Sequence, residues 1–347
     1  MFNIPRENFA LPFAVAIFTS AFLVFQIQPI IARLILPLYG GTPSVWTTCM
    51  FFFQTGLLVG YIYAHALVEY IQLKYQFIIH SCLLAISLLL FPIIPNMPKT
   101  SQSLPQTLEI IQVLSFSVGI PFILLSASSP LLQYWFGTVH PQKSPYRLYA
   151  LSNMGSLLAL LSYPFVVEPV FSLSTQTLFW SFGYLAFMGM TAWCEWSVIK
   201  NSLGQNSKQL NDVKIQINTS KSYSSIQSPG WFDRFIWILL TAGGSVVLLA
   251  VTNKMCQDVA VLPFLWVVPL CLYLITFILC FERDAWYQRK IWFPFLALSV
   301  GLLVFLLHRE YEESQISLVY QIIIYCAALF GCCMVCHGEI VRRRPTT

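Results

Sequence analysis

Long runs of apolar residues, separated by short polar connections, dominate this chain of 347 residues. A helix that crosses a lipid bilayer needs about 20 consecutive, mostly apolar residues. Ten segments meet this requirement and predict ten membrane-spanning helices. The predicted spans are residues 10–38, 45–67, 75–95, 108–127, 148–167, 176–198, 233–252, 259–281, 291–308 and 316–337.

The composition supports this interpretation. Apolar residues make up 57% of the chain and charged residues only 10%, against about 25% charged residues in an average soluble domain. The mean hydropathy is +0.70. A water-soluble fold of this size could not cover its surface with so few charges. The composition therefore excludes a soluble globular enzyme, a disordered chain and a nucleic-acid-binding domain, and it predicts an all-α polytopic protein of the lipid bilayer.

The basic residues predict an orientation, because short cytoplasmic connections carry an excess of Lys and Arg. With a cytoplasmic N-terminus, fifteen of the nineteen basic residues fall on the cytoplasmic side. The other four, which fall outside, are Arg33, Lys99, Lys254 and Arg309. We therefore expect both termini in the cytoplasm of a bacterial inner membrane, and we interpret the net charge of +5 as a topology signal.

A polar segment divides the predicted helices into six and four. Residues 199–232 are rich in Ser, Asn, Gln and Lys, a composition typical of a flexible cytoplasmic linker. It separates a first half, residues 1–198, from an incomplete second half, residues 233–347. Two helical halves joined by a basic linker are the layout of major-facilitator-type transporters. The second half has two helices fewer.

A short internal similarity favours two related halves. The sequence that ends the first predicted helix can be aligned with the sequence around residues 249–265. Leu36 and Pro37 then align with Leu262 and Pro263. In the same alignment Gln26 falls on Thr252.

Several long sequence segments resemble those of the bacterial family in which a transporter-like membrane domain is fused to a spermidine synthase-like domain. The first, at residues 25–65, begins FQIQPIIARLILPLYGG and resembles the first two helices of that family. Later segments with the same resemblance are LLSASSPLLQYWF (124–136), SPYRLYALSNMGSLLALLSYPFVVEP (144–169), AVTNKMCQDVAVLPFLWVVPLCLYLITFILCFE (250–282) and MVCHGEIVRRRP (334–345).

The resemblance implies a major-facilitator-like membrane domain followed by a soluble domain that binds S-adenosylmethionine or its decarboxylated form. This sequence ends at Thr347 with no glycine-rich nucleotide loop. We therefore expect no enzymatic activity and no cofactor. The chain is expected to be a truncated product, a fragment or half of a split system. Three functions stay open: a transporter-like domain for a small cation, a membrane anchor for a separately encoded synthase-like enzyme, and an inactive remnant.

Polar groups at membrane depth are the candidate functional residues, because they are costly there. Gln26, Gln28 and Pro29 interrupt the first predicted helix, and Arg33 follows one turn later. Proline removes a backbone donor, and a broken helix can expose backbone groups to a solute. We therefore predict a break in this helix.

Other polar residues are predicted at the same depth, toward the outer face. Glu168 ends the fifth predicted helix, and Asn253, Lys254, Gln257 and Asp258 lie between the seventh and eighth. One hypothesis places them with Gln26, Gln28 and Arg33 around an outward-facing cavity. Its acids would suit a small cationic solute such as a polyamine. The alternative is that all lie at the headgroup boundary, where Arg33 and Lys254 pair with the two acids.

The last predicted helix carries Cys332, Cys333, Cys336 and His337. Thiolates and imidazoles bind zinc, but no second ligand pair lies nearby in the sequence, so we expect no metal site. His337 begins a His-Gly-Glu word whose role the sequence does not reveal. Trp135 and Tyr149 are assigned to the aromatic belt at the membrane surface.

Overall fold

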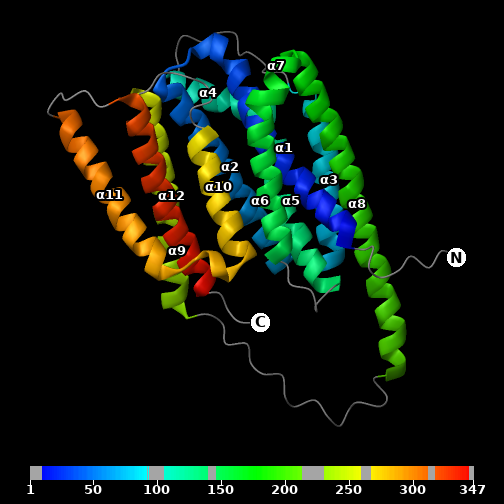
Figure 1. Cartoon of the computed structure of the whole chain (residues 1–347). Helices are drawn as coiled ribbons and strands as arrows, with labels where there is room; N and C mark the ends of the chain where they lie inside the picture. Colours follow the sequence, from blue (N-terminus) through cyan, green and yellow to red (C-terminus); the bar gives the residue numbers. More distant parts are fainter. Residues whose placement is uncertain are drawn as a thin grey trace.

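The structure is a computed structural model of the whole chain. It describes residues 10–91, 93, 105–139, 146–212, 230–258, 267–311 and 317–343. For residues 10, 43, 146–147, 201–212, 256–258, 284 and 310–311 only the backbone is described. Throughout these ranges the regular elements are helices, and no strand is formed (Figure 1).

The first half contains eight α-helical elements. They are α1 (Ala10–Tyr39), α2 (Pro43–Tyr70), α3 (Leu73–Ser87), α4 (Gln106–Leu114), α5 (Ile120–Val139), α6 (Tyr146–Ser162), α7 (Glu168–Val170) and α8 (Leu173–Asp212). Short π-helical turns join α4 to α5 and α6 to α7 into continuous helices. The second half consists of α9 (Trp231–Asp258), α10 (Val267–Glu282), α11 (Arg289–Tyr311) and α12 (Leu318–Arg342).

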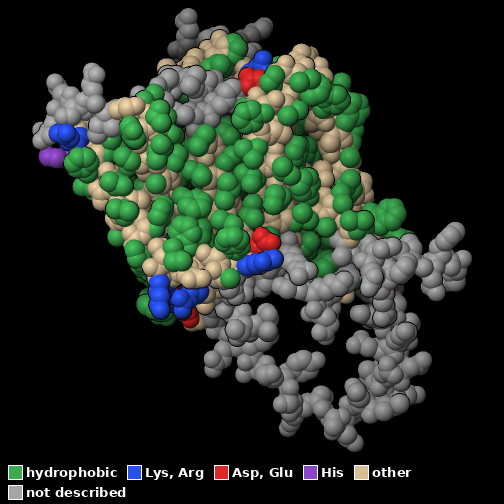
Figure 2. Space-filling view, viewed as in Figure 1, with side chains coloured by type: hydrophobic (Ala, Val, Ile, Leu, Met, Phe, Trp, Pro, Cys, Tyr) green, Lys and Arg blue, Asp and Glu red, His purple; other side chains and the backbone are tan. Residues whose placement is uncertain are grey.

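Each of the ten predicted segments contains a described helix, although residues 259–266 of the eighth segment lie outside the described ranges. In the described part of the chain, eight helical stretches are long and apolar enough to cross a membrane. The two other predicted spans correspond to α8 and to the shorter apolar helix α10. In Figure 2 apolar side chains cover the middle of the visible face, while Lys and Arg lie at its two ends. The chain is therefore an all-α, multi-pass membrane protein.

The helix boundaries depart from the prediction in the first half. The fourth span is a continuous helix from Gln106 to Val139, well beyond the predicted residues 108–127. The first of its two prolines, Pro121, follows a π turn at Ser115–Gly119, and the second is Pro130. Such a turn accommodates the missing backbone donor of proline without ending the helix. Helix α8 continues to Asp212, so the start of the predicted linker is helical.

The break predicted in the first helix is wrong. Helix α1 runs from Ala10 to Tyr39 and contains both Pro29 and Pro37. It ends at Gly40, whose φ of 75° is the left-handed conformation that glycine adopts readily at a helix C-terminus. Neighbouring helices support a proline-containing helix by packing around it. The absence of a break removes the exposed backbone groups that the prediction required.

Helix α1 is the centre of the first half (Figure 1), where it packs against α5, α6 and α8. Its apolar side chains, among them Phe13, Ile17 and Ile27, are fully buried in one large hydrophobic core. At Gly155 of α6 a Cβ atom would overlap the backbone oxygen of Phe18, so glycine permits this close approach. Small residues let helices approach closely in membranes, where packing drives association.

The helix contacts of the second half resemble those among the first four spans. In the first half, α5 contacts α1, α2 and α3; in the second, α12 contacts α9, α10 and α11. The fourth helix of each half therefore packs against the three that precede it. The aligned residues Leu262 and Pro263 lie outside the described residues, so the internal similarity stays a prediction.

The two halves meet through two helix pairs. Helix α6 packs extensively along α10, and α2 contacts α9 over a smaller area. Leu160 of α6 lies in a buried cluster with Val267, Cys271 and Leu274 of α10. We call the end of the bundle where α1 begins and α12 ends the terminal end (Figure 1).

Candidate functional sites

The two glutamines predicted to face a cavity are buried inside the bundle. Only 5% of Gln26 and 8% of Gln28 is exposed. The Gln28 side-chain amide donates to the backbone oxygen of Val24, one turn earlier, with 3.4 Å between the atoms. The side-chain oxygen of Gln26 has no hydrogen-bond partner among the described residues. Both side chains therefore belong to the core around α1.

Arg33 and Glu168 form an ion pair at the end of the bundle away from the terminal end. Their closest nitrogen and oxygen atoms are 3.8 Å apart. Beside this pair, the hydroxyl of Tyr163 donates to the side-chain oxygen of Gln176 at 3.1 Å. The structure thus brings together two of the predicted residues, as the headgroup-boundary interpretation expects. The side chains of Gln257 and Asp258 lie outside the described residues.

Asn253 lines a separate cavity of about 270 Å³ between α2 and α9. The wall contributed by α2 includes Trp46 and Thr47, and the wall contributed by α9 includes Thr252. Gln26, Gln28, Arg33 and Glu168 are not part of this lining. Those predicted residues whose side chains are described therefore lie in three separate positions, and Asn253 alone among them lines this cavity. Among the described lining residues there is no carboxylate.

A second polar region lies where α2, α6 and α10 meet. We call Tyr61, Tyr149 and Tyr273 the interface tyrosines, because these three side chains lie near one another across the contact between the two halves. Tyr61 is 53% exposed, and the other two are partly buried. Sequence reasoning assigned Tyr149 to the membrane surface and missed the other two. Tyrosine is common in apolar spans, so no local signal marks this convergence.

Aromatic contacts continue from the interface tyrosines into the second half. The ring of Tyr149 lies 4.9 Å from that of Phe281 and 6.0 Å from that of Phe277, measured between centroids. The ring of Tyr273 meets that of His337 edge to face at 4.9 Å. Residues of α6, α10 and α12 are thereby joined at the contact between the halves.

The assignment of Trp135 to the aromatic belt is wrong. Its side chain is completely buried inside the first half. The indole nitrogen donates to the side-chain oxygen of Gln76 at 3.0 Å. The indole ring packs edge to face on Phe77, with 4.8 Å between centroids. A buried partner for the indole nitrogen makes the interior favourable for this residue.

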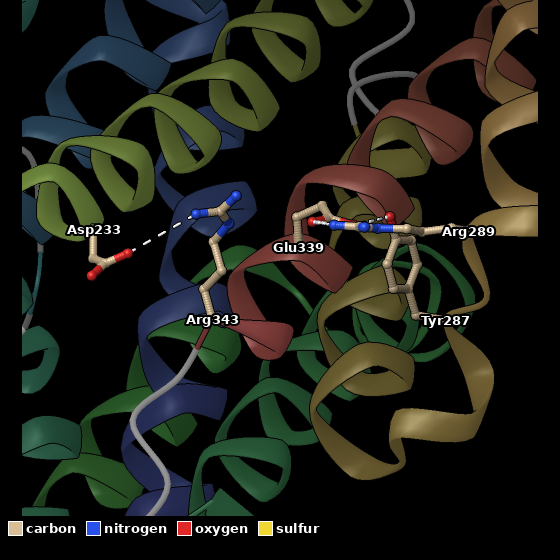
Figure 3. A network of polar contacts seen from close by, with 5 residues as sticks. All are labelled: Asp233, Tyr287, Arg289, Glu339 and Arg343. Carbon is tan, nitrogen blue, oxygen red and sulfur yellow. Dashed lines mark hydrogen bonds and ion pairs between the residues drawn. The ribbon is translucent and has the colours of Figure 1, made fainter.

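The His-Gly-Glu motif of α12 contacts the α10–α11 connection at the terminal end (Figure 3). Glu339 accepts a hydrogen bond from the Tyr287 hydroxyl at 2.8 Å and another from Nε of Arg289 at 2.7 Å. Its second oxygen pairs with Nη2 of Arg289. A Cβ on Gly338 would overlap the ring of Tyr287, so the glycine lets that ring lie on α12. The His-Gly-Glu motif therefore holds the α10–α11 connection against α12.

A second ion pair at this end connects α12 with α9. Arg343 lies 4.0 Å from a carboxylate oxygen of Asp233 (Figure 3). Both side chains are partly open to solvent. Tyr287, Arg289, Glu339, Asp233 and Arg343 together are called the terminal network. Burial, followed by its hydrogen bond to Glu339, raises the pKa of Tyr287 above the usual range.

His337 is fully buried between α10 and α12. Thr276 donates its hydroxyl proton to the backbone oxygen of Tyr273, so it accepts a hydrogen bond from Nδ1 of His337 at 2.9 Å. The imidazole stacks on Phe277, with 3.7 Å between ring centroids. Its Nε2 has no partner within the described part of the chain. These contacts explain the histidine as a packing residue that orients α10 against α12.

The cysteines around this histidine are free thiols, as are all nine cysteines whose side chains are described. In the described ranges, no three His, Cys, Asp or Glu side chains gather as metal ligands would.

Comparison with protein-family models, curated proteins and solved structures finds no match for the chain. The resemblance noted above therefore stays a prediction.

Proposed function

We propose that the protein is a transporter-like membrane domain that binds a small solute between its two halves. The observation that carries this proposal is the shared helix arrangement of the halves, with polar and aromatic groups at their junction. In transporters built from internal repeats, solutes bind at the interface between the repeats. The cavity beside Asn253 and the interface tyrosines both lie between the halves. A major-facilitator-like arrangement with both termini in the cytoplasm of the inner membrane is part of the proposal.

The proposed solute is a small organic cation, such as a polyamine. Aromatic rings attract ammonium groups through the negative faces of their π systems. The three interface tyrosines supply such rings from α2, α6 and α10. The amide of Asn253 adds a hydrogen-bonding group at the cavity. Aromatic recognition replaces the role that the sequence interpretation gave to Glu168 and Asp258. The proposal includes no chemical step.

The decisive experiment measures binding of radiolabelled spermidine to the purified, lipid-reconstituted protein. Removing one aromatic face costs about 1–2 kcal/mol in a desolvated site, or about tenfold in affinity. We therefore expect Tyr61→Ala to weaken binding about tenfold. Tyr70→Ala is the matched control, since Tyr70 lies on the same helix and is 81% exposed at its end. Equal affinity of the two variants, or no binding by the wild type, would refute the proposal.

A second candidate is a membrane anchor for a separate, acidic synthase-like partner. It is favoured by the basic side chains that gather at the terminal end (Figure 2). Three cations at this end are exposed and form no ion pair with another described residue. They are Arg283, Lys290 and Arg342. Replacing all three with glutamine would abolish co-purification of such a partner and leave spermidine binding unchanged. The reverse result would support the solute-binding proposal.

A further inference from the structure

Glu195 is a buried acid inside the first half. It lies on α8, within the predicted span 176–198, and only 7% of the residue is exposed. Carboxylates are costly in such surroundings unless they are paired, hydrogen-bonded or protonated. The protonation state of Glu195 therefore depends on the groups around its carboxyl oxygens.

One carboxyl oxygen of Glu195 has a partner and the other has none. The hydroxyl of Ser81 on α3 donates to Oε2 at 2.6 Å. Oε1 is buried and makes no hydrogen bond to any described residue. No arginine or lysine in the described ranges forms an ion pair with this acid. Lys200, the next cation along α8, lies over the ring of Trp196, 4.9 Å from its centroid.

The neighbouring titratable groups are uncharged hydrogen-bonding residues. The phenol of Tyr63 on α2 and the thiol of the adjacent Cys194 lie near Glu195. Tyr63 in turn contacts Nδ1 of His80 at 3.4 Å. Nε2 of His80 lies 3.0 Å from the hydroxyl of Ser128 on α5. That hydroxyl donates to the oxygen of Leu124, so it accepts the Nε2 proton of His80.

This chain of contacts fixes the tautomer of His80. Its Nε2 carries a proton, and its Nδ1 accepts a hydrogen bond from the hydroxyl of Tyr63. The imidazole is fully buried, and its two ring nitrogens contact the hydroxyls of Tyr63 and Ser128, neither of which is a carboxylate. A neutral histidine therefore gives Glu195 no balancing positive charge. A proton is then the simplest counter-ion for the acid.

We propose that Glu195 is a proton-binding site of the first half and is a neutral carboxylic acid at neutral pH. The bound proton occupies one carboxyl oxygen, and its release leaves a carboxylate that Ser81 holds by its hydrogen bond. A metal cation fits poorly, because calcium takes six to eight oxygen ligands, whereas the described groups around Glu195 offer two hydroxyls, those of Ser81 and Tyr63. The proposal is independent of the solute proposed above.

Infrared difference spectroscopy of the purified protein in lipid tests this site, because a protonated carboxyl group has its own C=O stretching band. We expect this band in the wild type at pH 7 and its loss in Glu195→Gln. Ser81→Ala removes a donor that stabilises the carboxylate. It should shift the titration midpoint of the band upward by about one pH unit.

The matched control is Glu282→Gln, which removes an exposed carboxyl group at the end of α10 and should leave the band unchanged. Absence of the band in the wild type at pH 7, or its persistence in Glu195→Gln, would overturn the proposal. If Glu195→Gln does not fold, the carboxyl band of the wild type is compared with that of Ser81→Ala. A band without the upward shift in Ser81→Ala contradicts the site, and a shifted band supports it.

Discussion

In its most apolar stretch, α1 has 67% of its residues buried, whereas α9, the corresponding first helix of the second half, has 22%. Helix α1 is surrounded by α5, α6 and α8 and belongs to one large core. Helix α9 packs mainly on α12, and the buried clusters of the second half are small. The same arrangement of four helices is therefore stabilised by different amounts of packing.

The second half makes up for its smaller core with polar contacts at the terminal end. The terminal network joins the first turn of α9, the start of α11 and the end of α12 (Figure 3). In the first half, hydrogen bonds such as Trp135 to Gln76 lie inside the bundle. We conclude that packing dominates the stability of the first half and that a few polar contacts matter more in the second.

The largest effect is expected from Trp135→Ala in the first half. Deleting a fully buried tryptophan leaves a cavity and an unpaired Gln76, which costs about 3–5 kcal/mol. Thermal unfolding of the purified protein in detergent measures this loss. Trp193→Ala is the control, because Trp193 is 56% exposed on α8. Similar unfolding temperatures for the two variants would show that the first half does not depend on its core.

A smaller but clear loss is expected from Gly338→Ala in the second half. The added methyl group would overlap the ring of Tyr287, and such overpacking typically costs about 1–3 kcal/mol. Gly301→Ala on α11 is the control, since a Cβ there meets no atom within 4 Å. Unfolding temperatures again provide the measurement. If Gly338→Ala unfolds like Gly301→Ala, the terminal network is unimportant for stability.

The terminal network also predicts a loss of stability at alkaline pH. The pKa of Tyr287 is raised in the folded state by burial and by Glu339. Its contribution is therefore complete below the unfolded pKa of about 10 and is lost as the pH rises above that value. We expect the unfolding temperature of Tyr287→Phe to fall less steeply than that of the wild type between pH 9 and pH 11, a window of about one unit on either side of that pKa. Parallel curves would contradict this role.

The smallest effect is expected from Glu168→Gln. The ion pair with Arg33 is partly exposed and its atoms are 3.8 Å apart. Such pairs contribute less than about 1 kcal/mol. Spermidine binding by Glu168→Gln should equal that of the wild type, in contrast to Tyr61→Ala. Weakened binding in Glu168→Gln would restore the outward-facing cavity of the sequence hypothesis.

The position of Glu195 shows what sequence reasoning could have found. No other acidic residue lies deeper inside a predicted span, so the sequence already carried the signal. Attention to the outer face led instead to Glu168, which pairs with Arg33. The partner of Glu195, in contrast, lies 114 positions earlier in the chain. No local pattern predicts such a contact.

The amino-acid sequence by itself determined that this is a helical, multi-pass membrane protein and where its helices lie. Lipid solvates no backbone polar groups, and a long apolar helix satisfies its own backbone hydrogen bonds, so the apolar runs and their length are a local signal in the chain. Tertiary structure alone decided that Trp135 is buried, that three tyrosines meet between the halves and that Glu339 holds Tyr287. These contacts join residues such as Tyr287 and Glu339, 52 positions apart, and depend on how the helices pack.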